Sequence, residues 1–249
     1  MATGERKRTD APPGAAARTH AVLSAALLAL GSGAVLWGAT QRPATDAELA
    51  PLGSAEYVQV LAENIVAAEH EWRAVHAALL AGALLWALGA PALRMRTGGG
   101  FTGTGLLALG MGAALWTVAL VLDGFVAPVR ASAAAAQSFT VRSLDGFRAT
   151  HEAAATLGVL GWLLIGLGVA ALSSAAVAAR ELPGPVRFGT GVPGVLVGLW
   201  PLAAVGAGFF RPGVFTSELW RPTAAVTAVW FVVAAAALVW TSLVSAKQG

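Results

Sequence analysis

Six apolar stretches limit what this chain can fold into more than any other feature of its sequence. They lie at about 21–40, 75–93, 104–126, 152–174, 190–210 and 223–244. Each is long enough to cross the roughly 30 Å hydrocarbon core of a bilayer as an α-helix. Only 12% of the 249 residues are charged, about half the usual share in a soluble domain. The sequence therefore predicts an all-α, polytopic bundle of six transmembrane helices.

The first apolar stretch follows a polar, basic tail over residues 1–19 and could be mistaken for a signal peptide. A signal peptide has an apolar region of about 7–15 residues, and this stretch is longer. We therefore expect an uncleaved first helix. Of the lysines and arginines, nine fall in the segments expected inside and seven in the longer segments expected outside. The positive-inside rule then predicts a multi-pass protein of the cell (inner) membrane with both termini cytoplasmic.

The first loop expected outside contains an amphipathic segment, Ser54–Glu71. Its apolar residues recur at helical spacing, and its acidic residues share the other face. The apolar positions are Val58, Leu61, Ile65 and Ala68, and the acidic positions are Glu56, Glu63 and Glu69. We expect a helix that lies along the outer membrane surface or packs over the mouth of the bundle.

Two sequence matches suggest an internal repeat. Residues 26–37 match residues 105–116 at nine of twelve positions, with an offset of 79, and residues 72–76 resemble residues 147–151, with an offset of 75. The chain then divides into hairpins over 20–93 and 101–179, with a degenerate third copy over 190–244. Because each unit has two helices, the copies would be parallel rather than inverted.

An aromatic residue and an arginine stand together at the start of the second, fourth and sixth helices. The pairs are Trp72 with Arg73, Phe147 with Arg148, and Trp220 with Arg221. Such pairs are typical of interfacial anchors, with the ring at headgroup depth and the guanidinium extended toward water.

His76 and His151 occupy matching positions just after two of these pairs, and Asp123 lies at the outer end of the third helix. Ionisable residues at this depth are candidates for function. We therefore predict a polar site of His76, His151 and Asp123, with Glu152 beside it, and both histidine rings facing the bundle. Axial ligation of haem b, a metal site or proton exchange with a quinol would all suit these side chains. Alternatively, they are interfacial polar residues without a shared role.

Several glycines have the spacing of close helix contacts. Gly194 and Gly198 form a G-x-x-x-G motif in the fifth helix, for contact within the bundle or between protomers. Gly31 and Gly33 in the first helix, and Gly110 and Gly112 in the third, also favour close packing.

The sequence contains no pattern of catalytic residues, and the chain has no cysteine, which excludes disulfides and thiolate metal sites. Its net charge of +3 includes no basic run of the kind that binds nucleic acid. Because the helices contain few polar groups, the leading prediction is a non-catalytic accessory or scaffold subunit in the lipid bilayer, bound to other membrane subunits or to itself. A redox protein with haem b or a metal is the main alternative, and a small-substrate transporter is the third.

Overall fold

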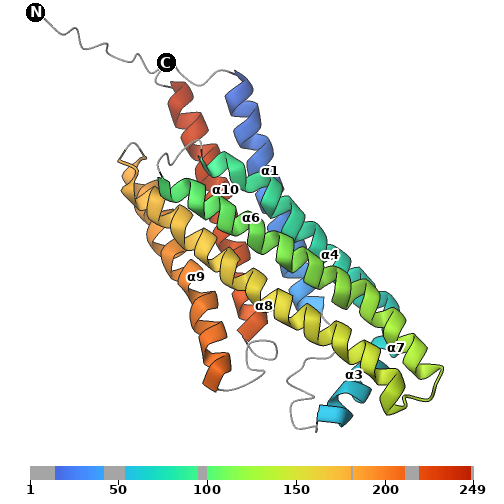
Figure 1. Ribbon diagram of the computed structural model, residues 1–249. Coiled ribbons are helices and arrows are strands. Elements are labelled where there is room, and N and C mark those ends of the chain that lie inside the picture. Colours follow the sequence, from blue (N-terminus) through green and yellow to red (C-terminus); the bar gives the residue numbers. More distant parts are fainter. Residues whose placement is uncertain (1–14, 42–53, 95–99, 181, 211–218, 248–249) are drawn as a thin grey trace, which may run out of the picture.

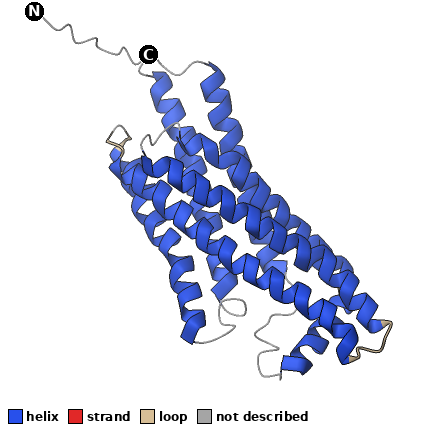
Figure 2. Ribbon diagram, viewed as in Figure 1, coloured by secondary structure: helices blue, strands red, loops and turns tan. Residues whose placement is uncertain are grey.

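The computed structural model describes residues 15–41, 54–94, 100–180, 182–210 and 219–247, and the regular structure in these residues is helical (Figures 1 and 2). The α-helices are α1 (Ala15–Gln41), α3 (Ser54–Ala67), α4 (Glu69–Gly89), α6 (Gly100–Val121), α7 (Ala127–Ala135), α8 (Val141–Ala178), α9 (Gly184–Phe210) and α10 (Trp220–Lys247). The 3-10 helix η1 (Ala90–Leu93) extends α4, and the π-helix η2 (Leu122–Val126) joins α6 to α7. Of the basic tail predicted over residues 1–19, residues 1–14 lie outside the described residues.

Among the described residues, six helices are long and apolar enough to cross a membrane. This finding confirms the prediction of an integral, multi-pass membrane protein in contact with lipid. The longest span is α8, whose 38 residues extend roughly 57 Å at 1.5 Å per residue. That length is almost twice the hydrocarbon thickness of a bilayer, so α8 must project beyond it.

The spanning helices pack in chain order around a ring. α1 packs on α4, α4 on α6, α6 on α8, α8 on α9 and α9 on α10, and α10 closes the ring on α1. A ring of helices leaves a central space that side chains must fill. Aromatic rings fill it here: Trp86 of α4 contacts Trp116 of α6 and Phe231 of α10, with ring centroids 6.0 and 4.5 Å apart, and Trp116 contacts Trp162 of α8 at 4.7 Å.

α3 and α7 lie at the end of the bundle opposite to that at which α1 begins and α10 ends (Figure 1). We call this the cap end. The apolar face of α3, with Leu61 and Ile65, packs against α7 and the start of α8, and it buries Ala131 and Phe147. The amphipathic segment therefore folds over the bundle, and its apolar face is covered by protein.

Glycines allow the closest helix contacts. A Cβ added at Gly112 would lie 2.6 Å from the backbone nitrogen of Ile165 in α8, and one at Gly31 would lie 2.9 Å from the Trp86 ring in α4. Gly33 and Gly110 have nothing within 4 Å of such an atom, so they form no contact of this kind. Gly194 and Gly198 both pack on α8. The G-x-x-x-G motif therefore makes its contact within the chain.

The repeat proposed from the sequence stays a prediction. Its longest match pairs Trp37 with Trp116, yet Trp37 is 48% exposed and Trp116 is 2% exposed. The shorter match fits the structure better, because Trp72 and Phe147 are both buried and each stacks on the histidine four residues later.

Candidate functional site

The π-helix η2 positions an acidic side chain at the cap end of the bundle. Asp123 is the second residue of η2, and its side chain is 15% exposed. π-Helical turns are rare and are frequently found at functional sites. The indole Nε1 of Trp72 in α4 donates a hydrogen bond of 2.8 Å to the backbone carbonyl of Asp123. This bond ties α4 to the π-helical segment.

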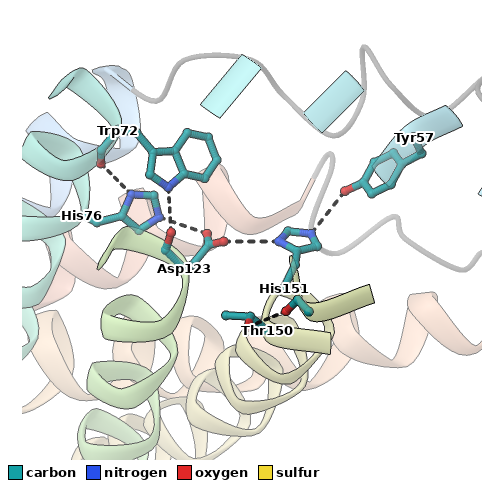
Figure 3. Close-up of polar contacts among 7 residues, drawn as sticks. Tyr57, Trp72, His76, Asp123, Thr150 and His151 are labelled. Carbon is teal, nitrogen blue, oxygen red and sulfur yellow. Dashed lines mark hydrogen bonds and ion pairs between the residues drawn. The ribbon is translucent and has the colours of Figure 1, made fainter. Parts of the chain in front are cut away.

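His76 lies one turn after Trp72 on α4 and reaches the carboxylate of Asp123 (Figure 3). Its Nε2 is 3.0 Å from Asp123 Oδ2, and its Nδ1 is 2.8 Å from the backbone carbonyl oxygen of Trp72. The imidazole also stacks on the Trp72 ring, with centroids 4.9 Å apart. With 3% exposure, His76 is buried where α4 packs against η2.

Gly124 makes room for His76. A Cβ added at Gly124 would collide with the Cβ and Cγ atoms of His76. Only glycine therefore lets the imidazole lie against the π-helix at this depth.

His151 of α8 approaches the same carboxylate from the opposite side (Figure 3). Its Nδ1 is 3.2 Å from Asp123 Oδ1, and its Nε2 is 3.4 Å from the hydroxyl of Tyr57 in α3. His151 stacks on Phe147 with the two ring planes 10° apart. Four helical segments thus contribute to one chain of contacts, Tyr57–His151–Asp123–His76, which we call the polar network.

The pattern of donors and acceptors in this network requires one proton to be shared between His76 and Asp123. The Trp72 carbonyl can only accept, so Nδ1 of His76 must carry a hydrogen. Nε2 of His76 then either donates to the Asp123 carboxylate as part of an imidazolium or accepts from a protonated carboxyl. In both cases, one proton lies between His76 and Asp123. When Asp123 accepts from both rings, Nδ1 of neutral His151 is a donor and its Nε2 accepts from the Tyr57 hydroxyl.

A cavity of about 120 Å³ opens beside the polar network and continues into the bundle. Tyr57, His76, Asp123 and His151 line its polar end, and Trp116, Trp162 and Trp220 line the apolar remainder. The distance from His151 to Trp162 along α8 is 11 residues, roughly 16 Å. The cavity therefore combines hydrogen-bonding groups near the cap with an aromatic interior.

One tryptophan that lines this cavity, Trp162, has an unsatisfied ring N–H donor. Trp162 is fully buried, and its Nε1 has no hydrogen-bond partner among the described residues. A buried N–H normally finds a partner, because leaving it unpaired costs about 1–3 kcal/mol.

Glu152 does not join the site. Its side chain is 71% exposed and lies 3.7 Å from Arg148, one turn earlier on α8. Arg73 makes the matching pair with Glu69 at 2.6 Å. Both pairs are at the surface, where such contacts contribute little to stability.

The aromatic residues expected as interfacial anchors are buried within the protein. Phe147 is fully buried, Trp72 is 1% exposed and Trp220 is 9% exposed. Their rings therefore pack against protein, and their depth in the membrane stays a prediction. The cap covers Trp72 and Phe147, because α3 and α7 bring apolar side chains over them. Trp220 of α10 lines the cavity.

The arrangement does not fit haem b or a metal ion. Among the described residues, no three His, Cys, Asp or Glu side chains are grouped so that they could hold a metal ion. Axial haem ligation would need two ring nitrogens facing the iron from opposite sides. Here Nε2 of His76 and Nδ1 of His151 both face the Asp123 carboxylate at hydrogen-bonding distance. The redox alternative with haem b or a metal therefore finds no support in this geometry.

Tyr57, Gly124 and Trp162 were not among the site residues predicted from the sequence. Tyr57 is the only tyrosine of the chain, and its place on an amphipathic helix was visible, but its approach to His151 depends on how α3 folds back. The Asp123–Gly124 pair inside an apolar run was the available signal for a close approach of another side chain.

No protein-family model, curated protein or solved structure matches this chain. Function must therefore be inferred from the chemistry of the site itself.

Proposed function

We propose that this membrane protein binds a small amphipathic molecule in the cavity at its cap end. The polar network holds the protic group of the ligand, and the aromatic interior holds its apolar part. The single observation that carries the proposal is that one cavity joins the polar network to the buried tryptophans.

The polar end supports binding of a group that shares a proton. Imidazole and carboxylate side chains exchange protons readily, and here they are linked by consecutive hydrogen bonds. Because His76 and Asp123 share one proton, the network can take up or release a proton without movement of a helix. A ligand hydroxyl such as that of a quinol fits this chemistry.

The apolar end supports a ring of modest size. An engineered apolar cavity of about 150 Å³ in another protein binds benzene, and this cavity is of the same order at about 120 Å³. Tryptophan walls provide broad contact surfaces for a flat ring. Pockets for drug-sized ligands are larger, at about 300–1,000 Å³. A single ring with one polar group is thus the best match.

The accessory or scaffold role predicted from the sequence is compatible with this proposal, since a subunit can bind a ligand without catalysis. Transport has less support. Trp86, Trp116 and Trp162 are nearly fully buried and pack together across the bundle, so its centre is occupied by aromatic rings rather than by polar groups.

The test is a ¹⁹F NMR titration of 4-fluorophenol with the protein in lipid nanodiscs. We expect a saturable change of the fluorine signal beyond that caused by empty nanodiscs. Ala155→Leu should abolish it, because Ala155 lines the cavity and leucine would fill the space. Ala153→Leu is the matched control, because Ala153 lies two residues away on the exposed face of α8.

Ala119→Leu fills the cavity from α6 and repeats the test if Ala155→Leu does not fold. A fluorine signal that responds equally to the wild type, to both cavity-filling variants and to empty nanodiscs would overturn the proposed function.

A further inference from the structure

We propose that Tyr57 occupies the position of the ligand hydroxyl, so that the site selects a phenolic hydroxyl group and binding requires Tyr57 to leave His151. This inference rests on the proposed function, because it names the ligand class and the control of the same cavity.

The contact between Tyr57 and His151 is the longest in the polar network. The Tyr57 hydroxyl lies 3.4 Å from Nε2 of His151, whereas the other contacts of the two histidines measure 2.8–3.2 Å. A well-formed hydrogen bond from a hydroxyl group is usually below about 3.0 Å. A ligand hydroxyl that enters the cavity can therefore make a better bond to the same nitrogen.

The direction of the hydrogen bonds sets the kind of ligand. When Nδ1 of neutral His151 donates to the Asp123 carboxylate, its Nε2 presents a lone pair to a hydroxyl in the cavity. A group that only accepts hydrogen bonds gains nothing there. The carboxylate fixes the imidazole by the same logic that orients the histidine of a hydrolase triad, in which Nε2 faces a hydroxyl.

The protein itself shows that a phenol fits at this position. The rings of Tyr57 and His151 have centroids 6.3 Å apart and are tilted by 46°, and Tyr57 lines the cavity beside His151 and Asp123. Tyr57 belongs to α3, which reaches the bundle as part of the cap and not as a spanning helix. Movement of this side chain leaves the membrane-spanning ring of helices unchanged.

Two titratable side chains contact His151 in this network, namely Tyr57 from α3 and Asp123 from η2. His76 of α4 lies on the other side of the Asp123 carboxylate. An aryl hydroxyl replaces the hydroxyl of Tyr57 with the same donor chemistry, so the shared proton between His76 and Asp123 is undisturbed. The exchange is a substitution of one phenol for another.

The experiment compares 4-fluorophenol with 4-fluorotoluene, which has nearly the same size and no hydroxyl, in the wild type and in Tyr57→Phe. Both titrations use the full chain in nanodiscs. We expect the wild type to bind the phenol more tightly than the toluene. Tyr57→Phe should bind 4-fluorophenol roughly two- to ten-fold more tightly than the wild type does, the range of one net hydrogen bond. Its affinity for 4-fluorotoluene should stay within two-fold.

Weaker binding of the phenol by Tyr57→Phe would overturn the inference, since Tyr57 would then be a ligand contact and not a competitor. Equal affinities of the wild type for the two probes would overturn the selection of a hydroxyl group. In either case a loss of binding in Ala155→Leu would leave the cavity proposal intact. Failure of Ala155→Leu to reduce binding of either probe would instead reject the cavity itself.

Discussion

Asp123 is the residue on which the polar network depends, because its two carboxyl oxygens lie within hydrogen-bonding distance of imidazoles from two different helices. Asn at this position can accept at Oδ1 from one ring and donate from its amide to the other. The hydrogen bonds can thus persist, while the shared proton is lost. We expect Asp123→Asn to lower the free energy of unfolding by about 1 kcal/mol, because neutral hydrogen bonds replace charge-assisted ones.

Asp123→Leu serves as the comparison, because it leaves both imidazoles unpaired at a cost of about 1–3 kcal/mol each. Denaturant titration in detergent measures both variants, and ¹⁵N NMR reports the protonation of His76. Equal losses for Asn and Leu would contradict a hydrogen-bonded role for the carboxylate.

Gly124 and Gly158 provide a matched pair at the same end of the bundle. Gly124→Ala should displace His76, because the new methyl group would overlap the imidazole. Overpacking of this kind costs about 1–3 kcal/mol. Gly158→Ala should be nearly neutral, since its Cβ would meet only Ala119 at 3.8 Å. Thermal unfolding of both variants in nanodiscs checks the difference, and similar melting temperatures would refute the steric argument.

Part of the site could be predicted from single residues. Ionisable side chains near the ends of apolar runs are uncommon, so His76, Asp123 and His151 stood out. Their convergence on one carboxylate could not be predicted, because sequence does not fix the rotation of each helix about its axis. Glu152 was included by adjacency to His151, yet the next residue along a helix is turned by about 100° and faces away.

At the scale of elements, α6 and α8 depend on small residues where their backbones approach. Gly112→Ala should lower stability by about 1–3 kcal/mol, because its methyl would overlap the α8 backbone near Ile165. Gly110→Ala is the control two residues away, in open space, and alanine there should be neutral or stabilising by up to about 1 kcal/mol. Denaturant unfolding in detergent measures the stability of both variants. An equal loss of stability at both positions would contradict the close contact between Gly112 and α8.

The helices themselves were predictable, but their ends were not. Apolar composition marks the membrane-crossing part of a helix, so the six spans could be predicted. The start of α8 at Val141 could not, because it lies in a polar stretch. The continuation of α6 through η2 into α7 was also missed. Pro128 near the start of α7 is read in sequence as a break, yet the helical run continues past it from η2 into α7.

At the scale of the whole molecule, the distribution of basic residues predicts that the cap end faces outward and that the termini face the cytoplasm. The cysteine-free sequence makes a labelling test direct. Gln137→Cys lies in the exposed turn between α7 and α8, and Arg180→Cys lies exposed after α8, at the other end. A membrane-impermeant maleimide should label the first in intact cells and the second only after permeabilisation. The opposite result would invert the molecule in the membrane.

The π-helical turn also determines how α7 is rotated about the helix axis relative to α6. Each residue of an α-helix advances the chain by about 100°, so the extra residue accommodated by η2 turns α7 relative to the direction that α6 would otherwise impose. That rotation brings Ala127, Ala131 and Ala134 onto the buried face under α3. Deleting one residue from η2 would leave the spanning part of α6 unaltered while rotating those alanines out from under the cap. A one-residue gap in this segment of a related chain would therefore mark a protein with a different cap and, because Asp123 shares the turn, a different site.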